Sequence, residues 1–204
     1  MKISIVLVGS GEFAREVAAM ILYSELNQQF DLLGYVSENH PTDLAPLQAP
    51  YLGEVSILKS LKAEIPSLAV AICIGNPVLR SKVFQQIEHL DLFYPNIIHP
   101  KSFVDWENRL DLEIGMGNII TQGCIFTTSI QLGNFNILNL GCLVGHDVRF
   151  SSFCTVMHGA KFSGGAVIGG RVLVGTGSAF IRKCEVPSNS IVPAYSVVRG
   201  DFIP

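Results

Sequence analysis

The chain has 204 residues, 17 acidic against 14 basic side chains, a formal net charge of −3 and a charged fraction of only 15%. Because Lys and Arg are few and scattered, a basic nucleic-acid-binding surface is excluded, and the hydrophobic content of 49% excludes a predominantly disordered chain. Ile114–His146 lacks charges, but Gly, Asn, Gln and Thr interrupt it, so no membrane insertion is expected. The N-terminus lacks a signal-peptide pattern, and we therefore expect a cytoplasmic protein.

Residues 1–95 alternate between two kinds of apolar pattern. Short apolar runs typical of buried strands occur at Ile3–Val8, Leu32–Val36 and Leu68–Ile74. Segments with the character of helices lie between and after them, at Phe13–Leu22, Val55–Ala63 and Arg80–His89. Strands that alternate with helices form a parallel sheet with helices on its faces. We therefore expect a small α/β domain in this half.

Phe93–Arg109 joins the halves and predicts entry coils, since its apolar side chains favour burial. From Ile114 onward, a large apolar residue recurs at every sixth position. The series is Ile114, Ile120, Phe126, Leu132, Leu138, Val144, Phe150, Val156, Phe162, Ile168, Val174, Phe180, Val186, Val192 and Val198. An unbroken period of six is the signature of a hexapeptide β-helix, a solenoid in which each coil covers the apolar edge of the previous one.

The same register explains most of the cysteines. The position four residues after the large apolar residue is usually small, and four of the five cysteines occupy it: Cys124, Cys142, Cys154 and Cys184. This pattern predicts small buried hydrophobic residues rather than nucleophiles or metal ligands.

Several motifs recur together in one known family. They are Gly9-Ser10-Gly11 before a helix, Ile74-Gly75-Asn76 with Arg80, Pro95–Pro100, and Ile137-Leu138-Asn139 followed by Gly145-His146-Asp147-Val148. Nearly the whole chain resembles the sugar acyltransferases of the NeuD/PglD type, which are sialic acid O-acetyltransferases and UDP-4-amino-sugar N-acetyltransferases. The resemblance implies a Rossmann-like nucleotide-sugar-binding domain in residues 1–95 and a left-handed parallel β-helix acyltransferase domain in residues 96–204. It also implies a homotrimer that uses acetyl-CoA as co-substrate, with no metal.

Acyl transfer from a thioester needs a base, for which histidine has a suitable pKa. By resemblance His146 is the general base, Asp147 sets its tautomer or basicity, and Asn139 supports the pair. The alternative is a surface histidine beside a solvated acid. Gly164 follows His146 by 18 residues, so three hexapeptides per coil would stack it on His146. A glycine lets a thioester approach closely, although the solenoid has many turn glycines.

The resemblance assigns the acyl-donor site to four residues: Thr155, Gly164, Thr176 and Ala194. The family commonly carries a second histidine where this chain has Thr155, and a histidine stands instead at His158. His158 either compensates for the missing histidine or lies at a subunit contact, and we favour the subunit contact.

The Gly9-Ser10-Gly11 turn before a helix is suited to phosphate binding. By resemblance the nucleotide-sugar site comprises Ser10, Gly11, Glu12, Ser37, Glu38, Gly75 and Asn76. A nicotinamide-binding fingerprint with Glu38 on the ribose is the alternative. It is disfavoured because this half has too few βα units for a full dinucleotide fold.

We expect acetyl transfer from acetyl-CoA to the amino group of a nucleotide-linked amino-deoxy sugar. O-acetylation of a sialic acid-type sugar is the close alternative, since His146 serves either acceptor. A non-catalytic relative that binds sugar nucleotides also stays open. A metal-dependent hydratase on this solenoid needs three histidines, and His146 and His158 have no third solenoid partner.

Overall fold

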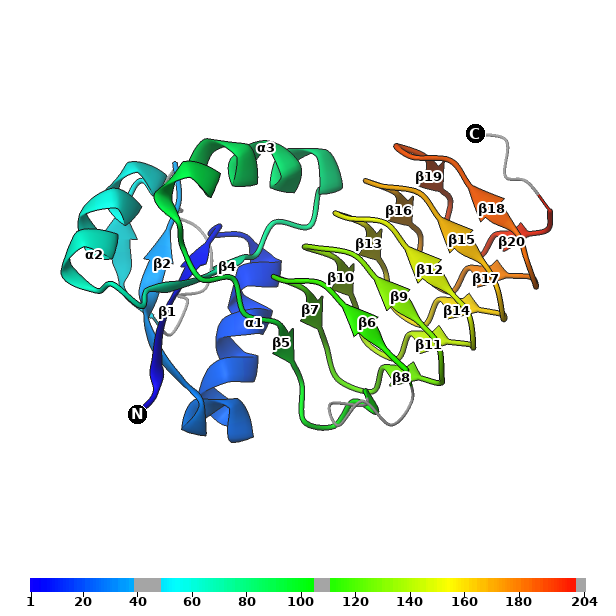
Figure 1. Cartoon of the computed structure of the whole chain (residues 1–204), viewed down its shortest axis with the longest axis horizontal. Coiled ribbons are helices and arrows are strands. Elements are labelled where there is room, and N and C mark those ends of the chain that lie inside the picture. Colours follow the sequence, from blue (N-terminus) through cyan, green and yellow to red (C-terminus); the bar gives the residue numbers. More distant parts are fainter. Residues whose placement is uncertain (39–48, 105–110, 201–204) are drawn as a thin grey trace. The chain divides into compact units, whose positions relative to one another are not determined.

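The computed structural model describes residues 1–38, 49–104 and 111–200, so residues 105–109 of the expected entry coils lie outside the described part. The chain divides into two compact units (Figure 1). The first unit comprises Met1–Gly75 and Leu79–Pro95, and the second comprises Asn76–Val78 and Asn96–Pro204. Within the described ranges, no helix combines the length and apolarity needed to span a bilayer.

The first unit contains a four-stranded parallel sheet in the order β3-β2-β1-β4. Its strands are β1 (Ile3–Val8), β2 (Phe30–Val36), β3 (Tyr51–Gly53) and β4 (Ala69–Ile72). The predicted parallel sheet is confirmed. Strand β3 was not predicted, because three residues give no apolar periodicity and its only local signals are the flanking Pro50 and its terminal glycine.

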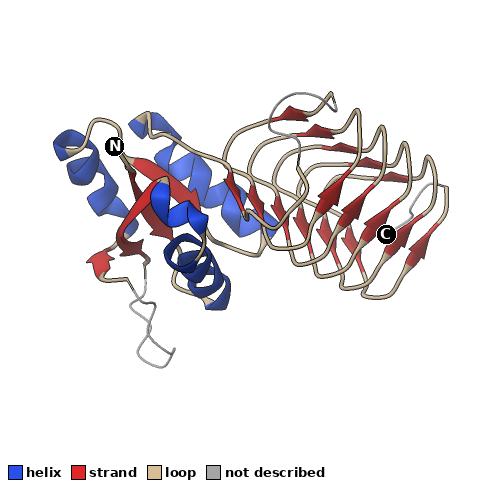
Figure 2. Ribbon diagram, turned by 90° about the horizontal axis from the view of Figure 1, so that it is seen from below, coloured by secondary structure: helices blue, strands red, loops and turns tan. Residues whose placement is uncertain are grey.

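Helices lie on both sides of this sheet (Figure 2). The α-helices are α1 (Glu12–Tyr23), α2 (Leu58–Glu64) and α3 (Pro77–Ile87), and the 3-10 helices are η1 (Glu25–Gln28), η2 (Val55–Ile57) and η3 (Glu88–Leu90). Helix α1 buries Ala14, Val17, Ala18 and Ile21, a spacing that forms one apolar helix face. Helix α3 starts at Pro77, three residues before the predicted start, because proline is well tolerated in a first turn.

The second unit is a left-handed parallel β-helix built of two-residue strands in three sheets. Sheet B contains β5 (Ile97–Ile98), β7 (Ile119–Ile120), β10 (Ile137–Leu138), β13 (Thr155–Val156), β16 (Leu173–Val174) and β19 (Ile191–Val192). Sheet C contains β8 (Ile125–Phe126), β11 (Leu143–Val144), β14 (Lys161–Phe162), β17 (Ala179–Phe180) and β20 (Val197–Val198). Sheet D contains β6 (Glu113–Ile114), β9 (Gln131–Leu132), β12 (Arg149–Phe150), β15 (Val167–Ile168) and β18 (Glu185–Val186).

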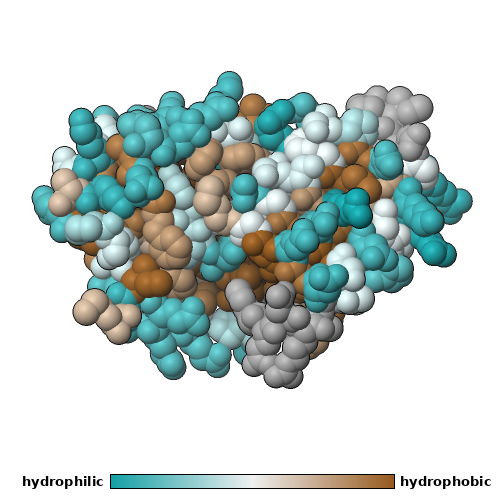
Figure 3. Space-filling view, in the orientation of Figure 1, coloured by the Kyte–Doolittle hydropathy of each residue, from teal (hydrophilic) through white to brown (hydrophobic). Residues whose placement is uncertain are grey.

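Each strand pairs with the strand one coil later, as Ile137 does with Thr155, so a regular coil has 18 residues. The predicted register of six is confirmed: every member of the series from Ile120 to Val198 is buried, and Ile114 packs against their cluster. The four cysteines of the small position are buried as well. Some large hydrophobic side chains remain exposed, and Figure 3 shows hydrophobic side chains among hydrophilic ones on the surface.

Half-buried Asn96 and buried Asn118 and Asn136 form a ladder at the start of successive sheet B strands. The Oδ1 atom of Asn96 accepts from the Asn118 N–H at 2.8 Å, that of Asn118 from the Asn136 N–H at 2.8 Å, and that of Asn136 from the Cys154 N–H at 2.7 Å. Each side chain thereby satisfies a backbone donor of the next coil, which a buried N–H requires.

Candidate active site at a solenoid corner

The chain changes direction at three corners in each coil, and the last residue of a corner commonly has a left-handed backbone. Asp147, Lys183 and Tyr195 have φ values of 61°, 58° and 58°, and Gly165 has 76°. We name the corners by the sheets they join: residues 145–147 belong to the C–D corner and 157–159 to the B–C corner. The stacked corners of successive coils form three ladders of side chains along the solenoid.

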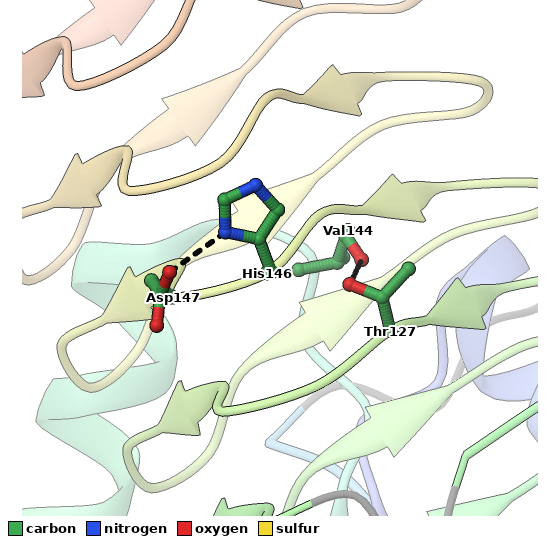
Figure 4. A network of polar contacts seen from close by, with 4 residues as sticks. All are labelled: Thr127, Val144, His146 and Asp147. Atoms are coloured by element: carbon green, nitrogen blue, oxygen red, sulfur yellow. Dashed lines mark hydrogen bonds and ion pairs between the residues drawn. The ribbon is translucent and has the colours of Figure 1, made fainter.

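His146 and Asp147 form a hydrogen-bonded pair at the C–D corner (Figure 4). The His146 Nδ1 atom lies 2.7 Å from Asp147 Oδ2, and their side chains are 56% and 62% exposed. At the same corner one coil earlier, the Thr127 hydroxyl donates to the Val144 carbonyl at 3.3 Å. An ionised carboxylate accepts the Nδ1 proton, which leaves Nε2 with a free lone pair. The geometry therefore suits a general base, and the catalytic roles of the pair stay a prediction.

Gly164 lies directly beside the His146 ring, one coil further on. A Cβ atom built on Gly164 would come within 2.4 Å of both Cε1 and Nε2 of His146. The Gly165 N–H donates to the His146 carbonyl at 2.9 Å and fixes this stacking. The Gly164 N–H itself has no acceptor among the described residues. The absence of a side chain at Gly164 is thus what makes room for the imidazole.

The remaining predicted residues of the solenoid lie away from His146 within the chain. Asn139 is buried at the B–C corner, where its amide donates to the Val156 carbonyl at 3.1 Å. Thr155 is buried on β13 of sheet B, and Thr176 and Ala194 follow on successive coils of the B–C corner. His158, half-buried, belongs to that corner too.

The first unit contains a cavity of 570 Å³ at the carboxyl ends of its strands. Six of the seven residues predicted for nucleotide-sugar binding line it, namely Ser10, Gly11, Glu12, Ser37, Glu38 and Gly75. Asn76 is not among the lining residues. The sequence reasoning missed the apolar walls, which consist of Val8, Phe13, Val55, Ile74, Leu79 and Val83. Apart from Ile74, which belongs to the Ile74-Gly75-Asn76 motif, only their positions near strand and helix ends could have indicated them.

Hydrogen bonds hold the rim of this cavity. The Ser10 and Ser37 hydroxyl oxygens are 2.9 Å apart, and the Tyr51 hydroxyl donates to the Ser37 carbonyl at 3.1 Å. Buried Arg80 donates to the carbonyls of Ile74 and Gly75, so it fixes the end of β4 that forms one wall.

Cys73, also in the cavity wall, stays a thiol. Its burial raises the pKa of the thiol far above the ordinary value, and the opposing charge of Arg80 only partly compensates. A protonated thiol is a poor nucleophile, so no covalent chemistry is expected there. Within the described ranges, no group of three His, Cys, Asp or Glu side chains is arranged to hold a metal ion.

Comparisons with known proteins agree with this architecture. Residues 4–87 match the family described as PglD N-terminal domain. A curated relative, GDP-perosamine N-acetyltransferase from Escherichia coli O157:H7, is 27% identical over 132 residues, which cover 65% of this chain and 57% of that protein. The match thus spans little more than half the length of that relative.

Solved structures share the fold of the whole chain. PerB from Caulobacter crescentus, in complex with CoA and GDP-perosamine, has a TM-score of 0.85 at 24% identity and covers 98% of this chain and 90% of its own. The acetyltransferase domain of PglB from Neisseria gonorrhoeae FA1090, in complex with acetyl coenzyme A, has a TM-score of 0.86 at 22% identity, with 99% and 93% covered. Residues 4–87 thus resemble the PglD N-terminal domain, and the chain has the fold of these two solved structures.

Proposed function

We propose that this protein transfers the acetyl group of acetyl-CoA to the amino group of a nucleotide-linked amino-deoxy sugar, with His146 as general base. The observation that carries the proposal is the His146–Asp147 pair stacked on a glycine with a free N–H. The relatives named for perosamine N-acetylation and for acetyl-CoA binding supply the substrate class.

The arrangement at the C–D corner supports a complete acyl-transfer cycle. The acceptor nitrogen attacks the thioester carbonyl carbon while Nε2 of His146 removes a proton from it, and Asp147 stabilises the resulting imidazolium. The Gly164 N–H is available as a hydrogen-bond donor to the developing oxyanion. Collapse of the tetrahedral adduct breaks the carbon–sulfur bond, and the imidazolium returns its proton to the leaving thiolate of CoA. The products are the amide and free CoA.

The cavity of the first unit suits the nucleotide part of the acceptor. Its apolar walls fit a planar base, the Glu38 carboxylate can accept N–H or O–H donors of a base or ribose, and α1 opens directly behind the Gly9-Ser10-Gly11 turn. The N-terminus of α1 offers backbone donors and a favourable dipole to phosphate.

Glu38→Ala is expected to weaken binding of the sugar nucleotide about tenfold, because a hydrogen bond to a carboxylate contributes on the order of 1.5 kcal/mol. Isothermal titration calorimetry with the sugar nucleotide measures this effect, and binding of CoA should not change. The matched control is Glu16→Ala, an exposed carboxylate on α1 that does not line the cavity. Equal affinities of Glu38→Ala and the wild type would remove Glu38 from the site.

We also propose a homotrimer in which the site is completed between protomers. Within one chain, His146 and Gly164 lie on the C–D corner, whereas Asn139, Thr176 and Ala194 lie on the B–C corner. Sheet C separates these corners, and its outward residues Ile125, Leu143 and Val197 are exposed at 46%, 39% and 57%. Such exposed apolar side chains are typical of surfaces covered in an assembly. Light scattering is expected to give three times the 22.2 kDa chain mass, and a monomer at assay concentrations would contradict a shared site.

The function itself is tested by release of free CoA thiol from acetyl-CoA. The acceptors are UDP-, dTDP- and GDP-linked 4-amino sugars, CMP-sialic acid and free sialic acid. Turnover with an amino sugar is the expected result. Turnover only with a sialic acid would instead indicate O-acetylation, and nucleotide binding without any turnover would favour a non-catalytic relative.

A further inference from the structure

Arg80 is a charged side chain in the interior of the first unit, where only 1% of it is exposed. It belongs to α3, the helix whose residues Leu79 and Val83 line the cavity of this unit. Its guanidinium donates hydrogen bonds to the carbonyls of Ile74 and Gly75. Burial of a guanidinium costs solvation free energy, and neutral donors would satisfy these two carbonyls at a lower cost. Hydrogen bonding alone therefore does not account for a charged side chain at this place.

The charge of Arg80 acts on the wall of the cavity. Cys73-Ile74-Gly75, which we call the β4 turn, lines the cavity, whereas Arg80 does not, so the guanidinium lies behind this turn. Burial raises the pKa of the Cys73 thiol, and the positive charge of Arg80 opposes this rise. An arginine stays ionised in proteins, and a buried charge is screened less than one in water. Arg80 thus gives this wall of the cavity a positive potential.

The lining of the cavity carries negative charge of its own. Among the described lining residues, Glu12 and Glu38 are carboxylates, and none is Lys, Arg or His. Glu12 is the first residue of α1, directly behind the Gly9-Ser10-Gly11 turn that suits phosphate. The N-terminus of a helix offers the equivalent of about half a positive charge, which is less than two carboxylates oppose. A diphosphate in this cavity therefore gains from a further cation, and Arg80 lies directly behind the wall.

The β4 turn lies next to the turn suited to phosphate, which follows β1. Strands β1 and β4 pair in parallel and end at Val8 and Ile72, which are partners. A Cβ atom built on Gly9 would lie 3.0 Å from the Cys73 carbonyl oxygen. A phosphate bound at the N-terminus of α1 is therefore close to the turn that Arg80 holds.

The hydrogen bonds of Arg80 also orient the backbone of this wall. In a trans peptide, the C=O and the N–H point in opposite directions. Because the Ile74 carbonyl points to the guanidinium, the N–H of the same peptide, which belongs to Gly75, points away from it. A Cβ atom built on Gly75 would meet nothing within 4 Å, so a ligand can approach this backbone closely. The positive end of the peptide dipole is thus directed away from the buried side of the turn.

We propose, on the basis of the proposed function, that Arg80 is a positioning residue of the acceptor site, which holds the diphosphate of the sugar nucleotide at the β4 turn without touching it. Its charge offsets the two carboxylates of the lining, and its hydrogen bonds fix the turn. The site thereby favours nucleoside diphosphates over nucleoside monophosphates, because a second phosphate adds negative charge near the guanidinium. Arg80 takes no part in the proton transfer.

The test measures how much affinity a second phosphate adds. Calorimetric titrations compare UMP with UDP, GMP with GDP, CMP with CDP and dTMP with dTDP, and the readout is the dissociation constant of the monophosphate divided by that of the diphosphate. For the pair that the wild type binds best, Arg80→Met is expected to lower this ratio about tenfold, since the charge is lost at similar side-chain length. Arg80→Lys should recover part of it, because a lysine restores the charge but not the planar donors.

The matched control is Lys82→Met, which removes the same charge from an exposed position of α3 and should keep the wild-type ratio. In thiol-release assays, Arg80→Met should raise the KM for the sugar nucleotide and leave kcat and the KM for acetyl-CoA unchanged. Glu12→Gln should raise the ratio, because a lining anion is lost while the core stays intact. This variant decides if Arg80→Met does not fold, and an unchanged ratio would then refute the proposal.

A purely structural role of Arg80 predicts a different result. It would weaken monophosphates and diphosphates by the same factor, and an unchanged ratio in Arg80→Met overturns the proposal. So does a wild type that gains no affinity from the second phosphate or binds none of the eight nucleotides. Failure of the proposed function is recognised separately: if the ratio falls as expected but the wild type releases no CoA thiol, acetyl transfer is refuted and the assignment of Arg80 stands.

Discussion

His146→Ala is expected to reduce kcat for acetyl transfer about 100- to 10,000-fold, the range by which positioned general bases accelerate reactions. The loss should fall on kcat because the imidazole takes up a proton only as the acceptor attacks. Folding should be unaffected, since the side chain is 56% exposed and its side-chain hydrogen bond joins it to the equally exposed Asp147. Stopped and continuous thiol-release assays give kcat, and calorimetry gives CoA binding, which should persist.

The control for this variant is His89→Ala, which removes an exposed histidine from the first unit and should retain wild-type kcat. Asp147→Asn tests the contribution of the second member of the pair. It keeps the shape of the side chain but removes the charge that stabilises the imidazolium, so it is expected to lower kcat less than His146→Ala. Wild-type kcat in His146→Ala would eliminate the proposed base.

Gly164→Ala is expected to lower kcat about 100-fold, because the added Cβ would meet Cε1 and Nε2 of His146 at 2.4 Å. The ring must then rotate or shift by about an ångström, and displacements of that size cost about two orders of magnitude in rate. The backbone does not oppose the substitution, since Gly164 lacks a left-handed φ. Thermal unfolding should therefore change little while thiol release falls.

Gly170→Ala is the matched control for the glycine. It occupies the middle position of the next corner along the chain, also without a left-handed φ, and its added Cβ would find its nearest neighbour at 3.4 Å, an ordinary contact. We expect it to keep full activity. If both alanine variants were equally active, the stacking of His146 on Gly164 would have no catalytic importance.

The repetitive half of the fold could be predicted from sequence because every coil repeats the same constraint. An apolar residue at each sixth position, from Ile120 to Val198, leaves a single register in which all of them are buried. The stacking of Gly164 on His146 follows from the same register, as a separation of one coil. The hand of the solenoid did not follow from periodicity, which is identical for either hand, and came from the resemblance.

Features that depend on tertiary arrangement were less accessible. A period of six does not say which corners come together: Asn139, which the resemblance groups with His146, lies at the B–C corner of the same chain, and its support of the pair stays a prediction. Strand β3 is too short to show a pattern, and it is ordered by pairing with β2. The apolar walls Val55, Leu79 and Val83 meet only when the sheet and its helices are assembled.

The coil length of 18 residues also sets the spacing of residues along the solenoid. Since each coil contacts only its neighbours, insertion or deletion of one whole coil between Gly165 and Ile181 would shift all later corner residues by about 4.8 Å relative to His146 and leave every inward side chain in register. Evolution of such a chain can therefore change the distance between His146 and any residue on a later corner in fixed steps of one coil. A change of any other length would rotate the corners out of line, and both the core and the ladder of side chains would be lost together.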